Sequence, residues 1–174
     1  MLIRIPYLTC VTLLLIMNAK AHSDIYPVTV TDDRNKQVVF EKKPESVASI
    51  SVFGADLLAA LGKKATGLST LNHKQPAFLK GQTQGILDLG EVHETNMELL
   101  TTLDPDLTIG MRNYTEPFEK KFEEIGKFLA YDMVTYKDSN RAIESAGTAL
   151  GERTNALKLN KDFSTSLAAH KEKA

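Results

Sequence analysis

This 174-residue sequence has only one cysteine and no tryptophan. The cysteine, Cys10, lies in the first apolar run, so a chain cleaved after that run has no thiol, disulfide or thiolate ligand. Histidine is also scarce. The four histidines do not have the spacing of metal ligands, and each is more easily explained as a surface residue; they are His22, His73, His93 and His170.

The net charge is also close to zero. The formal net charge of −1 provides no electrostatic surface for nucleic acid. The sequence has no nucleophile elbow, zinc-protease motif, phosphate-binding loop or dinucleotide fingerprint. With 43% apolar and 25% charged residues, the composition is that of an ordinary globular domain. We therefore expect a monomer that is not an enzyme and that has no cofactor, metal site or nucleic-acid partner.

The first 21 residues have the three parts of a secretory signal. Arg4 provides the basic start, Val11–Met17 the densest apolar run, and Ala19–Ala21 the small-residue cleavage site. The apolar run is shorter than the roughly 20 residues that a membrane-spanning helix needs. We predict cleavage after Ala21 and a periplasmic location. Lipidation is not expected, because Cys10 lies inside the apolar run.

The remaining chain alternates short β-rich runs with segments of helical spacing. Turn-forming residues 32–36 separate two such runs and predict a β-hairpin. The later alternation predicts βαβ units and a mostly parallel sheet of four or five strands flanked by helices, hence an α/β fold. The predicted strands are 28–31, 37–40, 47–51, 65–69, 86–89, 107–110 and 128–135; the predicted helices are 55–61, 97–103, 116–125 and 139–150; residues 71–84 are predicted to be a loop.

A long helix is predicted at the end of the sequence, over residues 152–171. Leu159, Phe163 and Leu167 recur at a spacing of four, with Ala156 on the same face. An apolar stripe of this kind needs a partner. Either the helix packs back on the sheet, or further sequence follows it in the intact protein.

Polar and aromatic side chains gather where the predicted strands end. Ligands of open α/β sheets bind beyond the carboxyl ends of the strands. Arg112 stands out, because an arginine after a buried strand can bind an anion through two parallel hydrogen bonds. Pairing with Glu116 or another surface acid explains it equally well. The candidate ligand-binding residues are Phe53, Ser69, Glu91, Arg112, Tyr114, Tyr136 and Lys137.

Three stretches resemble the class III periplasmic substrate-binding proteins, which serve ABC importers of ferric siderophores, haem and vitamin B12. The first is PESVASIS followed by ADLLAALG; the second is DLG, then NMELL and LDPDLTI; the third is ALGERT. The second is the most specific, because it is similar to the family pattern N-x-E-x-I-x-x-L-x-P-D-L-V-I. The likeness covers about residues 26–172.

The resemblance implies two α/β lobes joined by one helix, with the ligand between them. It divides the chain into a signal peptide (1–21), an N-terminal ligand-binding lobe (22–150) and the start of the connecting helix (151–174), with the second lobe absent. It also implies an inner-membrane ABC permease as partner and Glu98 as the residue that docks on it; a glutamate there also suits the first turn of a helix.

The hairpin and Arg112 resemble the siderophore branch of the family, so we expect a ferric siderophore as ligand. Haem and vitamin B12 are alternatives within the family, and Tyr114 and His93 match the axial ligands of a haem binder poorly. A truncated fragment without transport function is a further alternative. An enzyme of chelatase-like architecture is disfavoured, because the sequence offers no paired base, nucleophile or cysteine.

Overall fold

The computed structural model describes residues 25–171. The predicted signal segment, its cleavage after Ala21 and Cys10 lie outside the described residues. Across residues 25–171, the helices are too short or too polar to cross a bilayer.

A twisted sheet of six strands forms the centre of the fold, in the order β6-β5-β4-β3-β7-β8. Five strands are parallel and the two-residue β6 pairs antiparallel with β5 at one edge. The prediction of a mostly parallel α/β sheet is confirmed, with β6 as an addition. The strands are β3 (Val47–Ile50), β4 (Gly67–Thr70), β5 (Leu87–Glu91), β6 (Glu94–Thr95), β7 (Leu107–Met111) and β8 (Lys127–Tyr131).

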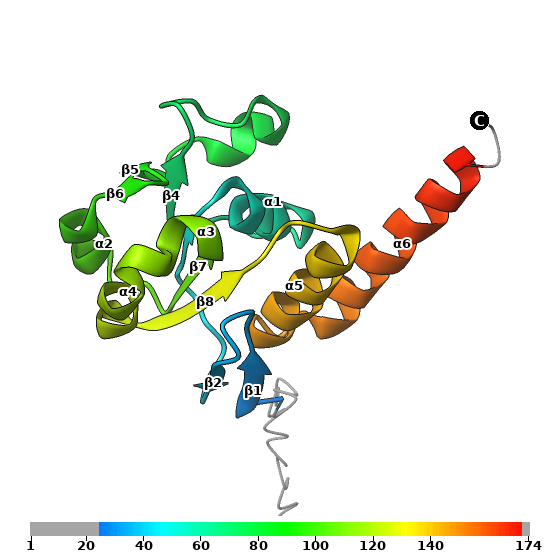
Figure 1. Ribbon diagram of the computed structural model, residues 1–174, viewed down its shortest axis with the longest axis horizontal. Helices are drawn as coiled ribbons and strands as arrows, with labels where there is room; N and C mark the ends of the chain where they lie inside the picture. Colours follow the sequence, from blue (N-terminus) through cyan, green and yellow to red (C-terminus); the bar gives the residue numbers. More distant parts are fainter. Residues whose placement is uncertain (1–24, 172–174) are drawn as a thin grey trace, which may run out of the picture.

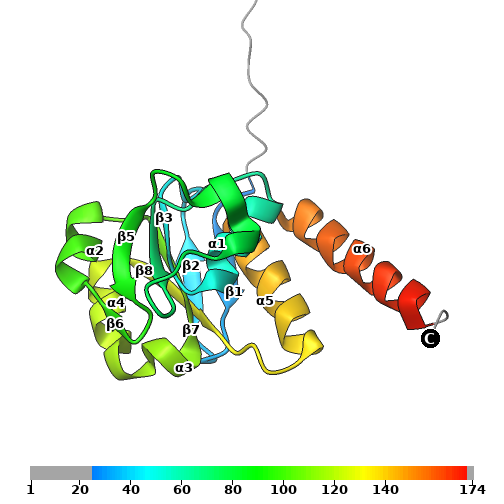
Figure 2. The ribbon, with the colours of Figure 1, turned by 90° about the horizontal axis from the view of Figure 1, so that it is seen from above.

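Helices cover both faces of this sheet (Figures 1 and 2). One face carries α1 and α5, and the other carries α2 and α4. Parallel strands are buried on both faces, which explains why all of β3 and the first four residues of β7 are buried without alternation. The helices are α1 (Val52–Ala60), η1 (Ala77–Thr83), α2 (Met97–Leu103), α3 (Arg112–Thr115), η2 (Glu116–Phe118), α4 (Glu119–Ile125), α5 (Tyr136–Ala149) and α6 (Arg153–Lys171).

Successive strand residues point to opposite faces and so contribute to two separate cores. Val47 packs with α1 and α5, whereas Ala48 and Ile50 pack with α2 and α4. Phe122 of α4 stacks on Phe128 of β8, with ring centroids 4.9 Å apart. The two cores hold the strand ends of β3, β7 and β8 in fixed positions.

The N-terminal hairpin lies beside the main sheet as a separate two-stranded ribbon. Its strands are β1 (Val28–Thr31) and β2 (Gln37–Phe40), with the boundaries that the sequence predicts. Val30 and Phe40 are buried in the core under α1 and α5. The turn of the hairpin reaches β8, where the backbone N–H of Asp33 donates to the carbonyl of Ala130 at 3.1 Å.

Helix α6 packs on α5 from Ala156, which meets Gly147, to Phe163, which stacks on Tyr136. Gly147 of α5 allows this close approach, because a Cβ there would lie 2.4 Å from the Cβ of Ala156. Ala156 is fully buried, whereas Phe163 and Leu167 are 56% and 39% exposed. Beyond this contact α6 projects from the lobe (Figure 1). The long terminal helix is therefore confirmed, and its apolar stripe is only partly covered.

Several boundaries differ from the sequence-based prediction. Strand β8 ends at Tyr131 rather than residue 135, because Thr135 caps α5 in a capping box with Asp138. The helix predicted over 116–125 is three short pieces that start at Arg112, with Pro117 in the first turn of η2. The predicted loop 71–84 contains η1.

Candidate binding surface at the carboxyl edge of the sheet

The carboxyl ends of the five parallel strands form one edge of the sheet. Helix α1 begins directly after β3, and its N-cap Ser51 accepts a hydrogen bond from the backbone N–H of Gly54 at 3.3 Å. Helix α3 begins directly after β7. Because helices cover both faces of the sheet, the side chains that follow the strands lie at this edge, which is where open α/β sheets bind their ligands.

Arg112 is the first residue of α3, immediately after β7. Its Nη1 donates to Oδ2 of Asp132 at 3.1 Å and to the backbone carbonyl of Asp33 at 3.3 Å. The side chain is 40% exposed. Within residues 25–171, Nε and Nη2 of Arg112 have no hydrogen-bond partner. The acid beside Arg112 is therefore Asp132 and not Glu116, and half of the guanidinium is still available to a ligand.

The turn of the hairpin supports this arginine from the other side. Asp33 accepts from the backbone N–H of Asp132 at 2.8 Å, and Arg141 of α5 binds the carboxylate of Asp33 with two bonds of 2.7 and 2.9 Å. Hydrogen bonds to Asp33 and Asp138 raise the pKa of Arg141 above its usual range. One carboxylate thus joins the hairpin, the end of β8 and α5.

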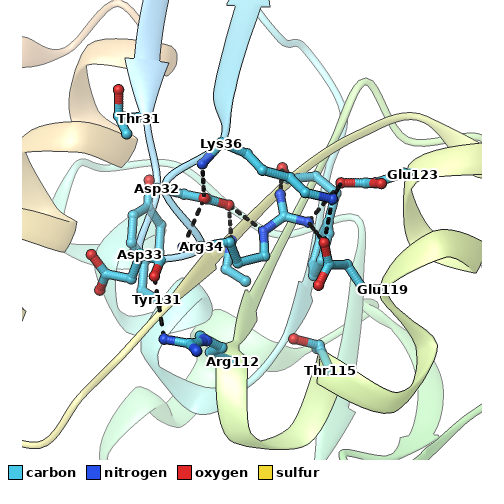
Figure 3. A network of polar contacts seen from close by, with 12 residues as sticks. Thr31, Asp32, Asp33, Arg34, Lys36, Arg112, Thr115, Glu119, Glu123 and Tyr131 are labelled. Carbon is cyan, nitrogen blue, oxygen red and sulfur yellow. Dashed lines mark hydrogen bonds and ion pairs between the residues drawn. The ribbon is translucent and has the colours of Figure 1, made fainter.

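A buried arginine anchors the same turn (Figure 3). Arg34 has a side chain only 5% exposed, and its Nε lies 2.6 Å from Oδ2 of Asp32, whose side chain is fully buried. Its Nη1 pairs with Glu119 and Glu123 at 3.1 and 2.7 Å. The guanidinium carbon also lies 4.5 Å from the ring centroid of Phe128. These contacts explain the hairpin position, and they leave Arg34 no free edge for a ligand.

Tyr114 lies on α3, two residues beyond Arg112, and is half-buried. Its ring packs edge-on against His93, with centroids 4.6 Å apart. His93 lies in the turn between β5 and β6, so this contact links the two halves of the carboxyl edge. Among residues 25–171, no three His, Cys, Asp or Glu side chains are gathered so that they could hold a metal ion.

Two of the predicted ligand contacts have partners inside the protein. Ser69 is fully buried, and its hydroxyl lies 3.2 Å from that of Thr95. Glu91 accepts from the backbone N–H groups of Asn72 and His73, two residues with φ of 56° and 53°. Glu91 thus stabilises a tight left-handed turn. The positions of both side chains argue for structural roles.

Phe53, Tyr136 and Lys137 lie around the start of α5. Phe53 packs edge-on against Tyr131 at 6.0 Å, and Tyr136 stacks on Phe163 of α6 at 5.3 Å. Phe53 and Tyr136 line one groove of about 370 Å³ between α1, α5 and α6. Lys137 is exposed in the first turn of α5. Of the seven predicted residues, Phe53 and Tyr136 line this groove, and Arg112 is not among its lining residues.

Glu98 is exposed in the first turn of α2, which follows the edge strand β6. The side chain of the N-cap residue Asn96 accepts from the backbone N–H of Leu99 at 3.0 Å, as the sequence predicts. Strand β6 and β8 lie at opposite edges of the sheet, so Glu98 and Arg112 occupy different parts of the lobe.

The family model of the periplasmic binding proteins matches residues 47–174. The chain belongs to the periplasmic binding protein family. This assignment confirms the resemblance drawn from the three sequence stretches, and the parallel sheet with a projecting α6 has the architecture of one lobe of such proteins.

A curated relative and two solved structures show how much of a family member this chain represents. An uncharacterized ABC transporter substrate-binding lipoprotein, YvrC of Bacillus subtilis (strain 168), is 26% identical over 163 residues, which are 90% of this chain and 50% of the relative. The iron uptake protein PiuA of Streptococcus pneumoniae is 28% identical with a TM-score of 0.70, covering 84% of this chain and 54% of its own.

Staphylococcus aureus SirA complexed with staphyloferrin B is 21% identical with a TM-score of 0.73, covering 82% of this chain and 48% of its own, and shares the fold. The chain therefore spans about half the length of the relatives that it matches.

Sequence inspection missed two residues of this surface, Asp33 and Asp132. Asp33 is predicted only as a turn residue, yet its partner Arg141 is 108 residues away. Asp132 is not recognised as a strand-end residue in the sequence, because the predicted strand continues to residue 135. A shorter β8 would have placed Asp132 at a carboxyl strand end, beside Arg112 on the neighbouring strand β7.

Proposed function

We propose that this chain is the N-terminal lobe of the extracytoplasmic substrate-binding component of an ABC importer, and that it binds a ferric siderophore without catalysing a reaction. The observation that carries the proposal is Arg112, a half-exposed arginine held at the carboxyl edge through Nη1, whose Nε and Nη2 have no hydrogen-bond partner among residues 25–171. Ferric complexes of catecholates and hydroxycarboxylates are anionic, and a guanidinium edge binds such oxygen atoms in pairs. PiuA, the 28% identical neighbour, is described as an iron uptake protein.

The arrangement favours a siderophore over haem. The Nε and Nη2 edge of Arg112 suits an anionic chelate, whereas His93 and Tyr114 already contact each other through their rings. In the proposed two-lobed protein, residues 22–150 form the first lobe and residues 151–174 begin the connecting helix. One lobe alone leaves ligand contacts solvated, so we expect weak binding by this chain.

Delivery to an inner-membrane permease through Glu98 is part of the proposal, supported by the exposure of Glu98 at the start of α2. Glu98→Arg in a two-lobed protein should impair transport without changing ligand affinity, and an equal loss of both would contradict a docking role.

We also propose cleavage after Ala21. The intact mass of the exported protein tests this cleavage, and a lipid on Cys10 would contradict it.

The central experiment compares anionic and neutral chelates of the diamagnetic ion gallium(III). The purified chain is titrated with a trianionic gallium tris-catecholate and a neutral gallium tris-hydroxamate, with calorimetry as the readout. Arg112→Gln should weaken binding of the trianionic complex by at least about tenfold, because losing a charge-assisted contact costs about 2–5 kcal/mol. The neutral complex should be affected much less.

Arg153→Gln is the matched control, because Arg153 is an exposed arginine paired with Glu144 on the helices α5 and α6. It removes the same charge from another part of the lobe. Unchanged affinity of the Arg112→Gln chain for every anionic chelate would overturn the proposed ligand contact.

A further inference from the structure

We propose that Asp132 is a positioning residue for Arg112: together with the backbone carbonyl of Asp33 it holds Nη1, so that the Nε and Nη2 edge is ready for the ligand's oxygen atoms. This inference rests on the proposed function. It adds a residue that no sequence pattern indicated, and it explains what the ion pair at the carboxyl edge does.

The contacts of Arg112 divide its guanidinium into two parts. Both hydrogen bonds, of 3.1 Å to Asp132 and 3.3 Å to Asp33, use Nη1. A guanidinium has five N–H donors in a planar fork, and carboxylate or phosphate oxygens fit two adjacent donors at once. Fixing one nitrogen restricts rotation of the plane, whereas Nε and Nη2 keep their donors.

Asp132 is itself held in place, which a merely adventitious surface acid would not be. Its backbone N–H donates to Oδ2 of Asp33 at 2.8 Å. Asp33 has a side chain only 8% exposed and is bound by Arg141 through two hydrogen bonds. Asp33 therefore supports Arg112 twice, through its own carbonyl and through the backbone of Asp132.

Asp132 has two opposing effects on an anionic ligand. Its hydrogen bond orders a long side chain before the ligand arrives, and immobilising such a side chain costs about 0.5–1.5 kcal/mol at a binding site. Its negative charge repels the same ligand. Alanine removes both effects, whereas asparagine keeps a hydrogen-bond acceptor and removes the charge, so the pair of substitutions separates orientation from charge.

The test is a nuclear magnetic resonance titration of the ¹⁵N-labelled chain with the trianionic gallium tris-catecholate, observed at backbone amides and at the arginine Nε–H groups. Asp132→Ala should bind about twofold to tenfold more weakly than Asp132→Asn, because the two variants lack the same charge and differ in the ordering of one side chain, which costs about 0.5–1.5 kcal/mol. Asp132→Asn should bind at least as tightly as the unaltered chain. In Asp132→Ala without ligand, the heteronuclear NOE of Arg112 Nε should fall, because the side chain becomes mobile.

Asp162→Ala on α6 is the control for loss of one exposed carboxylate, and it should change neither affinity nor the Arg112 NOE. An alanine variant that binds as tightly as the asparagine variant would overturn the positioning role. If Arg112→Gln loses binding while Asp132→Ala and Asp132→Asn bind equally well, only this inference fails. If Arg112→Gln binds as tightly as the unaltered chain, Arg112 is not a ligand contact and the proposed function loses its main support.

Discussion

The two halves of the sheet are stabilised in different ways. On the β7–β8 side, the strands pair in continuous register over five residues, and the hairpin turn inserts the buried Arg34 beside them. On the β4–β5 side, the pairing shifts register between Leu68 and Thr70, and the edge strand β6 has two residues. Phe78 of η1 on that side is 62% exposed. The proposed anion-binding residue, Arg112, thus lies on the half with continuous strand pairing and a buried ion pair.

The largest expected effect comes from replacing Arg34, the buried arginine on the β7–β8 side. Arg34→Met should lower the free energy of unfolding by about 3–5 kcal/mol, because it leaves the fully buried carboxylate of Asp32 without its charge partner. Urea-induced unfolding measures this loss. Arg153→Met, at an arginine 59% exposed, should stay within about 0.5 kcal/mol. Equal losses in both variants would contradict the contrast between anchored and solvated arginines.

A smaller and more local effect is expected on the other half. Glu91→Ala removes the acceptor for the backbone N–H groups of Asn72 and His73. Exchange of these two amide hydrogens should accelerate by about tenfold to a hundredfold, since a hydrogen bond to a charged group contributes about 1.5–3 kcal/mol locally. The free energy of global unfolding should change by less than about 1 kcal/mol. Glu94→Ala on β6 is the control, and a global loss as large as that of Arg34→Met would contradict local opening.

The smallest effect is a pH dependence at the opposite, amino edge. Hydrogen bonds from the backbone N–H groups of Ser46 and Glu45 and from the Ser46 hydroxyl lower the pKa of Asp106. A carboxyl with a lowered folded pKa contributes stability above its unfolded pKa, about 3.9, and loses it as pH falls through the folded value. Asp106→Asn should therefore cost about 1 kcal/mol at pH 7 and progressively less below about pH 4. A cost that does not vary with pH would contradict this origin.

Local patterns predicted much of the fold. The hairpin strands and α2 have the predicted boundaries, because turn residues and the Asn96 cap mark them in the sequence. The parallel order follows from alternating strands and helices. The boundaries failed where one signal competed with another: the apolar residues after Tyr131 extended the predicted strand, although Thr135 was already the cap of the next helix.

The site was less predictable, because its contacts join distant residues. Arg112 was singled out correctly as a residue at a strand end, but its partner could be found only once β7 and β8 were known to be neighbours. The sequence indicates only a turn residue at Arg34. In the structure Arg34 is buried, and one of its ion-pair partners is Glu123, 89 residues away. Ser69 and Glu91 were predicted as ligand contacts from position alone, and position does not show whether a side chain already has a partner.

The most direct test of the account maps where the metal of an anionic chelate lies on this lobe. Backbone amide spectra of the ¹⁵N-labelled chain are compared with the ferric and the gallium forms of the same tris-catecholate, because paramagnetic iron broadens nearby resonances and gallium does not. The account predicts broadening centred on Arg112 and its neighbours at the carboxyl ends of β7 and β8, and its loss in Arg112→Gln. Broadening centred on the amino edge, or on the groove between α1, α5 and α6, would contradict it.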